Sequence, residues 1–171
     1  LVAAQGRADH LEAILAAFET LLSPEGVGYI SYNVYPGWKA KEIIRDAMML
    51  RGGDRGTPQE KLSYGRGMID FLEEVAPADS VLARALADYR AESTHVRDYY
   101  VLHEQLERFN SPCYFLEFGK RAEPHRLAYL ADAAPQTMFA VNYGEKVSVP
   151  LLKECGHSQI LVEQYLDFVV N

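Results

Sequence analysis

Residues 26–38 constrain the fold of this chain more than any other segment. They follow a helical pattern that stops at a Ser-Pro-Glu-Gly run, and residues 27–34 are rich in β-branched and aromatic side chains. In a strand, alternate side chains point to opposite faces, and here the residues of both faces are apolar apart from Ser31 and Asn33. This pattern is typical of a strand in a parallel sheet covered by helices on both faces. A Pro-Gly turn and the only tryptophan, Trp38, come next. We therefore predict a buried strand at 27–34, and open parallel sheets bind ligands at the carboxyl ends of such strands.

Helical patterns surround this strand. Apolar residues recur at helical spacing over residues 9–22, so a helix leads into the strand. Further along, Thr57 and Glu60 have the spacing of a helix capping box, with Pro58 in the first turn. The periodicity predicts three helices that form one small bundle, at residues 38–51, 58–75 and 80–93.

The last part of the chain predicts a return to mixed structure. Residues 99–106 suit a helix that ends at Asn110-Ser111-Pro112. A helix follows from about Phe115, residues 127–131 resemble a short strand, and two more helical patterns close the chain after residue 144. The predicted fold class is α+β, mostly α, with a helical bundle attached to a few strands.

Composition narrows the classes of partner. The chain has 171 residues and a net charge of −7, and its basic residues are interleaved with acidic ones, so we expect no nucleic-acid partner. No apolar run approaches the roughly 18 residues of a membrane span, so we expect no membrane partner. Cys113 and Cys155 have no Cys-x-x-Cys pairing, and we interpret them as reduced thiols of a cytoplasmic protein rather than a disulfide. The chain starts without methionine and stops just after an apolar run, so we expect a piece of a longer protein.

The sequence contains no complete catalytic set. It lacks a Gly-x-Gly-x-x-Gly run after a strand, a Walker motif and a Gly-x-Ser-x-Gly elbow. The glycine-rich residues 52–56 lie between two predicted helices, which indicates a connector rather than a phosphate loop. The five histidines are scattered, whereas zinc needs three or four convergent ligands. We therefore assign no catalytic, cofactor-binding or metal-binding residue to this chain.

The end of the predicted strand is one candidate wall of a ligand cleft. Here the Asn33 amide and the Tyr35 hydroxyl are available to a bound group, with Trp38 beside them. The alternative is a plain strand end and turn, with Trp38 packed over the sheet.

A second candidate lies in the segment 98–104. His103 next to Glu104 suits a general base or a polar clamp, and Tyr99 precedes them in the same segment. The alternative is a solvated or capping element of a helix. Glu117, in the segment that follows, is a weaker addition to this group.

Several short motifs, taken in order, resemble a known family. Residues 26–33 followed by Tyr35-Pro36-Gly37-Trp38 look like the end of a class I S-adenosylmethionine-dependent methyltransferase domain. The chain then resembles the predicted methyltransferase regulatory domain of bacteria. The further matching motifs are Arg45-Asp46-Ala47-Met48, Tyr99-Tyr100-Val101-Leu102-His103-Glu104, Tyr114-Phe115, Glu117-Phe118 and Glu163-Gln164-Tyr165-Leu166-Asp167-Phe168. The resemblance spans nearly the whole chain, and related multidomain proteins resemble protein lysine methyltransferases.

This resemblance implies three parts and an incomplete class I methyltransferase-like sheet. Residues 1–36 would be the C-terminal part of the methyltransferase α/β domain. Residues 37–110 would be a helical regulatory or cap region, and residues 111–171 would return to the sheet and end in helices.

The resemblance also implies a function. The chain would be a regulatory or cap segment that shapes or controls access to the methyl-acceptor cleft, and would not be catalytic alone. The cofactor S-adenosylmethionine would bind elsewhere in the parent methyltransferase, because this sequence lacks the family's glycine-rich loop. The expected partners are the methyltransferase catalytic domain and a second copy of the chain. The alternative is a helical protein-interaction or dimerisation module without a methyltransferase role. The expected cleft residues are Asn33, Tyr35, Trp38, Tyr99, His103, Glu104 and Glu117.

Overall fold

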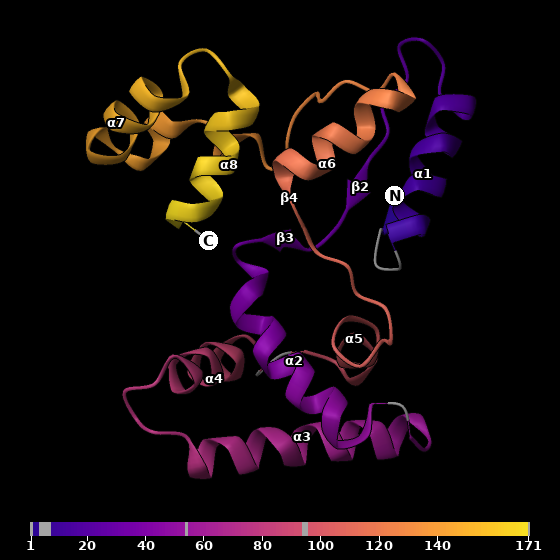
Figure 1. Ribbon diagram of the computed structural model, residues 1–171, viewed down its shortest axis with the longest axis vertical. Helices are drawn as coiled ribbons and strands as arrows, with labels where there is room; N and C mark the ends of the chain where they lie inside the picture. Colours follow the sequence, from indigo (N-terminus) through magenta and orange to yellow (C-terminus); the bar gives the residue numbers. More distant parts are fainter. Residues whose placement is uncertain (1, 4–7, 54, 94–95, 171) are drawn as a thin grey trace. The chain divides into compact units, whose positions relative to one another are not determined.

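The chain divides into two compact units. The computed structural model describes residues 2–3, 8–53, 55–93 and 96–170 (Figure 1). Unit 1 comprises Leu1–Gly37 and Ser111–Asn171, and unit 2 comprises Trp38–Asn110. Unit 2 is therefore an insertion in the sequence of unit 1. The described residues are mostly helical with a few short parallel strands, which confirms the predicted fold class.

Unit 2 consists of helices, as its periodicity predicts. The helices are α2 (Trp38–Gly52), α3 (Pro58–Val75), α4 (Val81–Ser93) and α5 (Asp98–Glu104). The predicted capping box at the start of α3 is confirmed. The Thr57 backbone N–H donates to Glu60 Oε2 at 2.7 Å, and the Glu60 N–H donates to Thr57 Oγ1 at 3.3 Å. These bonds satisfy two backbone donors that a helix start leaves without intrahelical partners.

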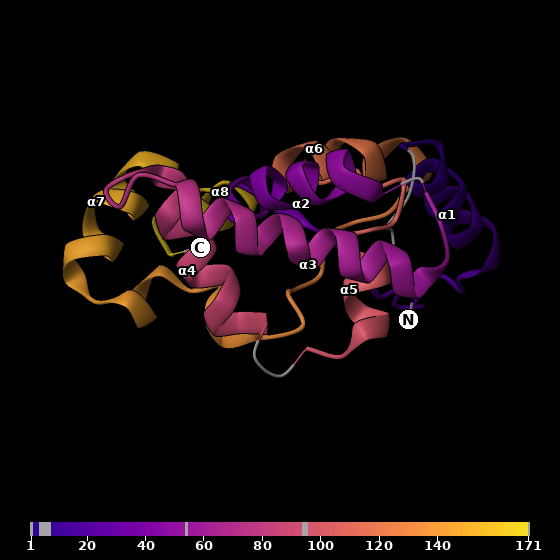
Figure 2. The same cartoon turned by 90° about the horizontal axis from the view of Figure 1, so that it is seen from below.

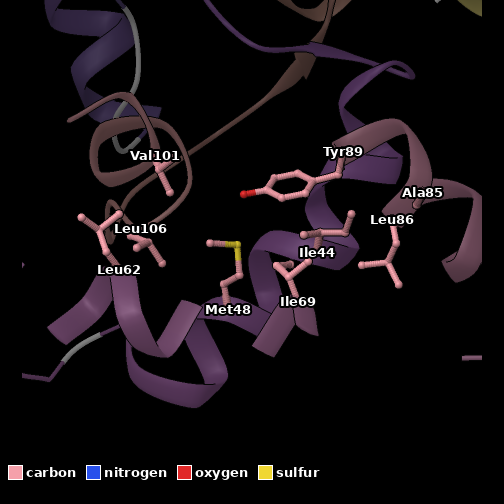
Figure 3. Packing of buried hydrophobic residues seen from close by; sticks show 9 residues of the cluster. All are labelled: Ile44, Met48, Leu62, Ile69, Ala85, Leu86, Tyr89, Val101 and Leu106. Atoms are coloured by element: carbon pink, nitrogen blue, oxygen red, sulfur yellow. The ribbon is translucent and has the colours of Figure 1, made fainter. Parts of the chain in front are cut away.

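One apolar cluster holds the helices of unit 2 together. α2 packs on α3 and lies next to it in both views (Figure 2). At this contact a Cβ on Gly65 of α3 would lie 2.8 Å from Met48 Cε, so glycine permits the close approach of the two helices. Arg45 of α2 donates from Nη2 to the Glu107 carbonyl at 2.6 Å and so ties the segment after α5 to the bundle. The buried cluster consists of Ile44, Met48, Leu62, Ile69, Ala85, Leu86, Tyr89, Val101 and Leu106 (Figure 3).

The strands of unit 1 are short and form two parallel pairs. β1 (Val2–Ala3) pairs with β2 (Ile30–Ser31), and β3 (Val34–Tyr35) pairs with β4 (Cys113–Tyr114). The single buried strand predicted at 27–34 is therefore wrong. β2 and β3 are separate, and Val27 is 69% exposed. β-branched and aromatic composition favours an extended chain, but a strand needs a partner ladder, and these partners are two residues long.

Unit 1 also differs from prediction after α6 (Phe115–Ala122). Residues 127–131, all of them described, form no strand; they follow a 3₁₀ turn, η1 (Glu123–His125), and a left-handed Arg126. The turn is tied to α1 (Ala8–Leu21), because the His125 ring nitrogens lie 3.3 Å from Glu12 Oε2 and 3.2 Å from Glu19 Oε2. These polar contacts fix the loop against a helix, whereas a strand would need a backbone ladder.

The C-terminal part of unit 1 has its own apolar cluster. After η2 (Pro135–Thr137) and η3 (Ala140–Tyr143) come the predicted helices, α7 (Glu145–Cys155) and α8 (Gln159–Val170). The buried side chains of this cluster are Ala140, Leu151, Cys155, Val162 and Leu166. Among the described helices of both units, none has the length and apolar character needed to cross a lipid bilayer.

Candidate functional site

The seven predicted cleft residues are divided between the two units. Three of them lie in unit 1 and four lie in unit 2, so a single cleft that contains all seven stays a prediction. The unit 1 residues are Asn33, Tyr35 and Glu117. The unit 2 residues are Trp38, Tyr99, His103 and Glu104.

In unit 1 the structure brings Tyr35 and Glu117 together through Tyr114. The register of β3 and β4 places Tyr35 opposite Tyr114, with ring centroids 5.4 Å apart. The Tyr114 backbone N–H donates to Glu117 Oε2 at 3.0 Å, so this carboxylate sits at the N-terminus of α6, where the helix dipole favours it. The Asn33 carbonyl accepts from the Cys113 N–H at 3.3 Å. Tyr35 and Glu117 thus each contact Tyr114 at the carboxyl ends of paired parallel strands.

We call Tyr35, Tyr114 and Glu117 the strand-end group, and further aromatic rings of unit 1 lie in the same elements or stack on them. Tyr114 stacks on Phe168 of α8 with centroids 5.8 Å apart, and Tyr32 stacks on Phe118 of α6 at 4.4 Å. Burial raises the pKa of the Tyr32 hydroxyl and raises the pKa of the Cys113 thiol to about 11. Both groups stay protonated at neutral pH, so neither supplies a nucleophile or a base.

In unit 2 the predicted pair on α5 is spread around the helix. His103 is exposed and Glu104 is half-buried, and consecutive residues of a helix do not face each other. Tyr99 is 60% exposed and lines a surface hollow of about 260 Å³ with Val96, Arg97 and Tyr100. This arrangement favours the interpretation of the segment as a solvated helix over a joined His–Glu base.

Trp38 instead lines a second, more enclosed pocket in unit 2. This pocket has a volume of about 200 Å³ and is formed by α2, α4 and the α5 region. Its lining residues are Trp38, Lys41, Tyr89, Glu92, Ser93, Val96, Tyr100, Val101 and Gln105. Trp38 is 8% exposed, which makes it a fixed wall of the pocket.

Polar contacts organise the pocket. The Lys41 ammonium lies 2.7 Å from Glu92 Oε2 and 5.9 Å from the centroid of the Trp38 ring. The Tyr89 hydroxyl donates to Gln105 Oε1 at 3.0 Å and so joins α4 to the end of α5. Neither Lys41 nor Glu92 was among the predicted site residues. Lys41 follows Trp38 by three residues, and Glu92 follows Tyr89 by three residues. This spacing places each pair on one face of its helix, and it is the one sequence signal for their shared location.

Two carboxylates act on Tyr100, which lines the pocket. Burial raises the pKa of its hydroxyl, and the charges of Glu104 and Glu92 raise it further. Within the described ranges of the chain, no group of three or more His, Cys, Asp or Glu side chains is placed to hold a metal ion. The described lining offers aromatic side chains, the Glu92 carboxylate and the Lys41 ammonium.

Comparison with known proteins agrees with the sequence resemblance. Residues 97–171 match the predicted methyltransferase regulatory domain family. The chain is 33% identical over 151 residues to the uncharacterized protein RP789 of Rickettsia prowazekii (strain Madrid E), and the match covers 88% of this chain and 27% of that protein. It is 30% identical over 167 residues to the uncharacterized protein sll1526 of Synechocystis sp. (strain ATCC 27184 / PCC 6803 / Kazusa), covering 94% and 32%.

The chain is also similar to solved structures of a larger protein. The structure of PKMT2 from Rickettsia typhi superposes with a TM-score of 0.76 at 31% identity, covering 96% of this chain and 30% of that one. PKMT2 in complex with AdoHcy gives the same TM-score at 30% identity, covering 96% and 31%. The chain thus spans about a third of the length of these relatives. The predicted family is confirmed by the match of residues 97–171 to its model.

Proposed function

We propose that this chain is the regulatory region of a methyltransferase and that it shapes access to the methyl-acceptor cleft. The family match of residues 97–171 carries the methyltransferase assignment. The order of the elements supports the role in access, because the sequence of unit 2 begins directly after β3 and its turn. In open parallel sheets the carboxyl ends of the strands are where ligands bind.

The proposed contribution of unit 1 to this cleft is the strand-end group of Tyr35, Tyr114 and Glu117. Its two rings offer apolar surface, and its carboxylate, held by the Tyr114 N–H, offers a fixed acceptor. Such fixed contacts orient an acceptor for methyl transfer. The buried free cysteines Cys113 and Cys155 support a reducing, cytoplasmic location.

We place the S-adenosylmethionine site in the part of the methyltransferase that lies outside this chain. The complex of PKMT2 with AdoHcy, which is S-adenosylmethionine without its methyl group, supports this cofactor for the full-length protein. Calorimetric titration of the 171-residue chain with S-adenosylmethionine should give no binding heat. A dissociation constant in the micromolar range would overturn this placement.

The access role is tested in the full-length protein with Tyr35→Leu and Glu117→Gln. Methyl incorporation is measured with tritiated S-adenosylmethionine and a total extract of cellular protein as the acceptor mixture. Loss of one orienting contact worth about 1.4 kcal/mol lowers the rate roughly tenfold at low acceptor concentration, while the affinity for the cofactor stays unchanged. Tyr165→Leu and Glu145→Gln make the same chemical changes on exposed faces of α8 and α7 and serve as matched controls.

Two results would count against the access role. In one, the Tyr35 and Glu117 variants transfer methyl groups as fast as the controls do. In the other, they lose cofactor affinity in proportion to the rate, which would place these side chains at the cofactor instead of the acceptor.

A second candidate function is a helical protein-interaction module. Phe71 and Val75 are 50% and 54% exposed and lie one turn apart on α3, so they form an apolar stripe. Light scattering over a range of concentrations should then show self-association that Phe71→Glu removes. A mass that stays monomeric at all concentrations argues against this candidate.

A further inference from the structure

The pocket of unit 2 has the chemical features of a cation site. Three aromatic side chains, Trp38, Tyr89 and Tyr100, line it together with the carboxylate of Glu92. Aromatic faces attract organic cations, and a carboxylate adds the opposite charge. The volume of about 200 Å³ is below the roughly 300–1,000 Å³ of pockets for drug-sized ligands. The pocket therefore suits a group of the size of one side chain.

An ammonium group of the chain already uses these features. Lys41 Nζ lies 2.7 Å from Glu92 Oε2, and its distance of 5.9 Å from the Trp38 centroid is within the roughly 6 Å range of a cation–π contact. The side chains of Lys41 and Glu92 are 39% and 58% exposed, and an ion pair this exposed contributes little to stability. Lys41 can therefore leave at little cost when another cation arrives.

The charges around the pocket favour a cation over an anion. The charges of Glu92 and Glu104 both raise the pKa of the Tyr100 hydroxyl, so both carboxylates act on that wall of the pocket. Among the lining residues that the structure describes, Lys41 is the one basic side chain, and Glu92 neutralises it. An incoming anion would meet these carboxylates, whereas an incoming cation would take over the Glu92 contact.

We propose that this pocket binds a quaternary ammonium group, such as the head of a trimethylated lysine side chain, and that Lys41 is its built-in competitor. A methylated ammonium has lost the N–H donors with which Lys41 binds water and Glu92. It gains apolar contact with the walls formed by Trp38, Tyr89 and Tyr100. Binding at this pocket uses residues of unit 2 alone and does not depend on the proposed function.

The sole tryptophan makes the test direct, because fluorescence of Trp38 reports on the pocket wall. The full-length protein is freed of other tryptophans outside this chain and titrated with choline chloride, with sodium chloride keeping the ionic strength constant. Dimethylbutanol, the uncharged carbon isostere of choline, is titrated in parallel. We expect a saturable fluorescence change with choline and none with dimethylbutanol.

Variants assign the binding to the named side chains. Tyr100→Leu and Glu92→Gln should weaken choline binding roughly 2- to 30-fold, the range that one cation contact contributes. Lys41→Gln should tighten binding, because it removes the competitor. Glu74→Gln makes the same charge change on the exposed face of α3 and should leave the affinity unchanged.

Three outcomes would overturn the proposal. The first is an equal response to choline and dimethylbutanol, and the second is no response in either the parent protein or Lys41→Gln. The third is an affinity in Glu92→Gln that equals that of Glu74→Gln. Circular dichroism checks the fold of each variant. Tyr100 is 45% exposed, so its truncation leaves the core intact, and Glu92→Gln supplies an independent variant that removes no apolar surface.

Discussion

The close approach of α2 to α3 at Gly65 predicts that a larger residue at this position destabilises the chain. A Cβ at position 65 would lie 2.8 Å from Met48 Cε and 3.5 Å from Leu106 Cδ2. Carbon atoms pack best at about 3.5–4.0 Å, so the first of these contacts is a clash. Met48 is fully buried, so its terminal methyl group cannot move aside into solvent. Gly65→Ala should therefore overpack the core of unit 2.

Two opposing contributions set the change in the free energy of unfolding that Gly65→Ala causes. Alanine in place of glycine in a helix interior stabilises by about 0.5–1 kcal/mol, and an added methyl group in a packed core costs about 1–3 kcal/mol. We expect a net loss of about 1 kcal/mol in the free energy of unfolding, or a fall in Tm of roughly 2–4 °C. In a Met48→Ala background the clash is gone, so Gly65→Ala should stabilise by about 0.5–1 kcal/mol. The sign of the effect reverses between the two backgrounds.

Urea unfolding followed by Trp38 fluorescence measures this effect, because the only tryptophan of the chain is buried in unit 2. Gly119→Ala in α6 is the matched control, since a Cβ there would meet nothing within 4 Å. Circular dichroism should show that this control stabilises by about 0.5–1 kcal/mol. Two results would rule out the clash: Gly65→Ala stabilises the parent chain as Gly119→Ala does, or the effect of Gly65→Ala is the same in the Met48→Ala background.

Three further predictions concern single contacts. Thr57→Ala removes the cap of α3 and should cost about 1 kcal/mol in thermal unfolding by circular dichroism; an unchanged Tm would contradict the cap. His125 and Arg126 lower the pKa of Glu19 below 4.5, so this contribution to stability is present above pH 4.5 and is lost as the pH falls through the lowered pKa. The stability difference between the parent chain and His125→Ala should therefore shrink below pH 4.5, and a constant difference would argue against the contact. Cys113, buried with a raised pKa of about 11, should react with a thiol reagent at pH 8 only after unfolding; fast reaction in the native chain would show that the site opens.

Features that depend on neighbours in the sequence were predictable. The start of α3 is fixed by Thr57 and Glu60, three residues apart, and the predicted helix 58–75 has the observed bounds. The other helices of the bundle were predictable for the same reason, because the apolar residues of each helix recur at helical spacing within its own segment. The strand prediction failed because β3 takes its partner from β4, far along the chain, and residues 27–34 contain no information about the length of that partner.

The candidate site also depends on contacts between distant segments, which the sequence does not reveal. Trp38 was predicted to line a cleft at the strand end, and that cleft stays a prediction. In the structure Trp38 lines a different pocket, which α2, α4 and the α5 region form within unit 2. Tyr89 has the helical spacing of a core residue and is indeed in the core cluster, yet its ring also lines the pocket. Lys41 and Glu92 are ordinary surface charges in the sequence. Their meeting depends on how α2 and α4 pack, which no local pattern specifies.

The insertion of unit 2 between β3 and β4 has a consequence for protein synthesis. Residues 36–112 separate the two paired strands, so β3 leaves the ribosome roughly 4–15 s before β4 at typical rates of translation. The helical bundle between them has mostly local contacts and folds within microseconds to milliseconds. The nascent chain therefore carries a finished bundle beside a strand whose edge has no partner, and such an edge pairs readily with other chains. The interval before β4 emerges is the period in which this chain is most exposed to aggregation.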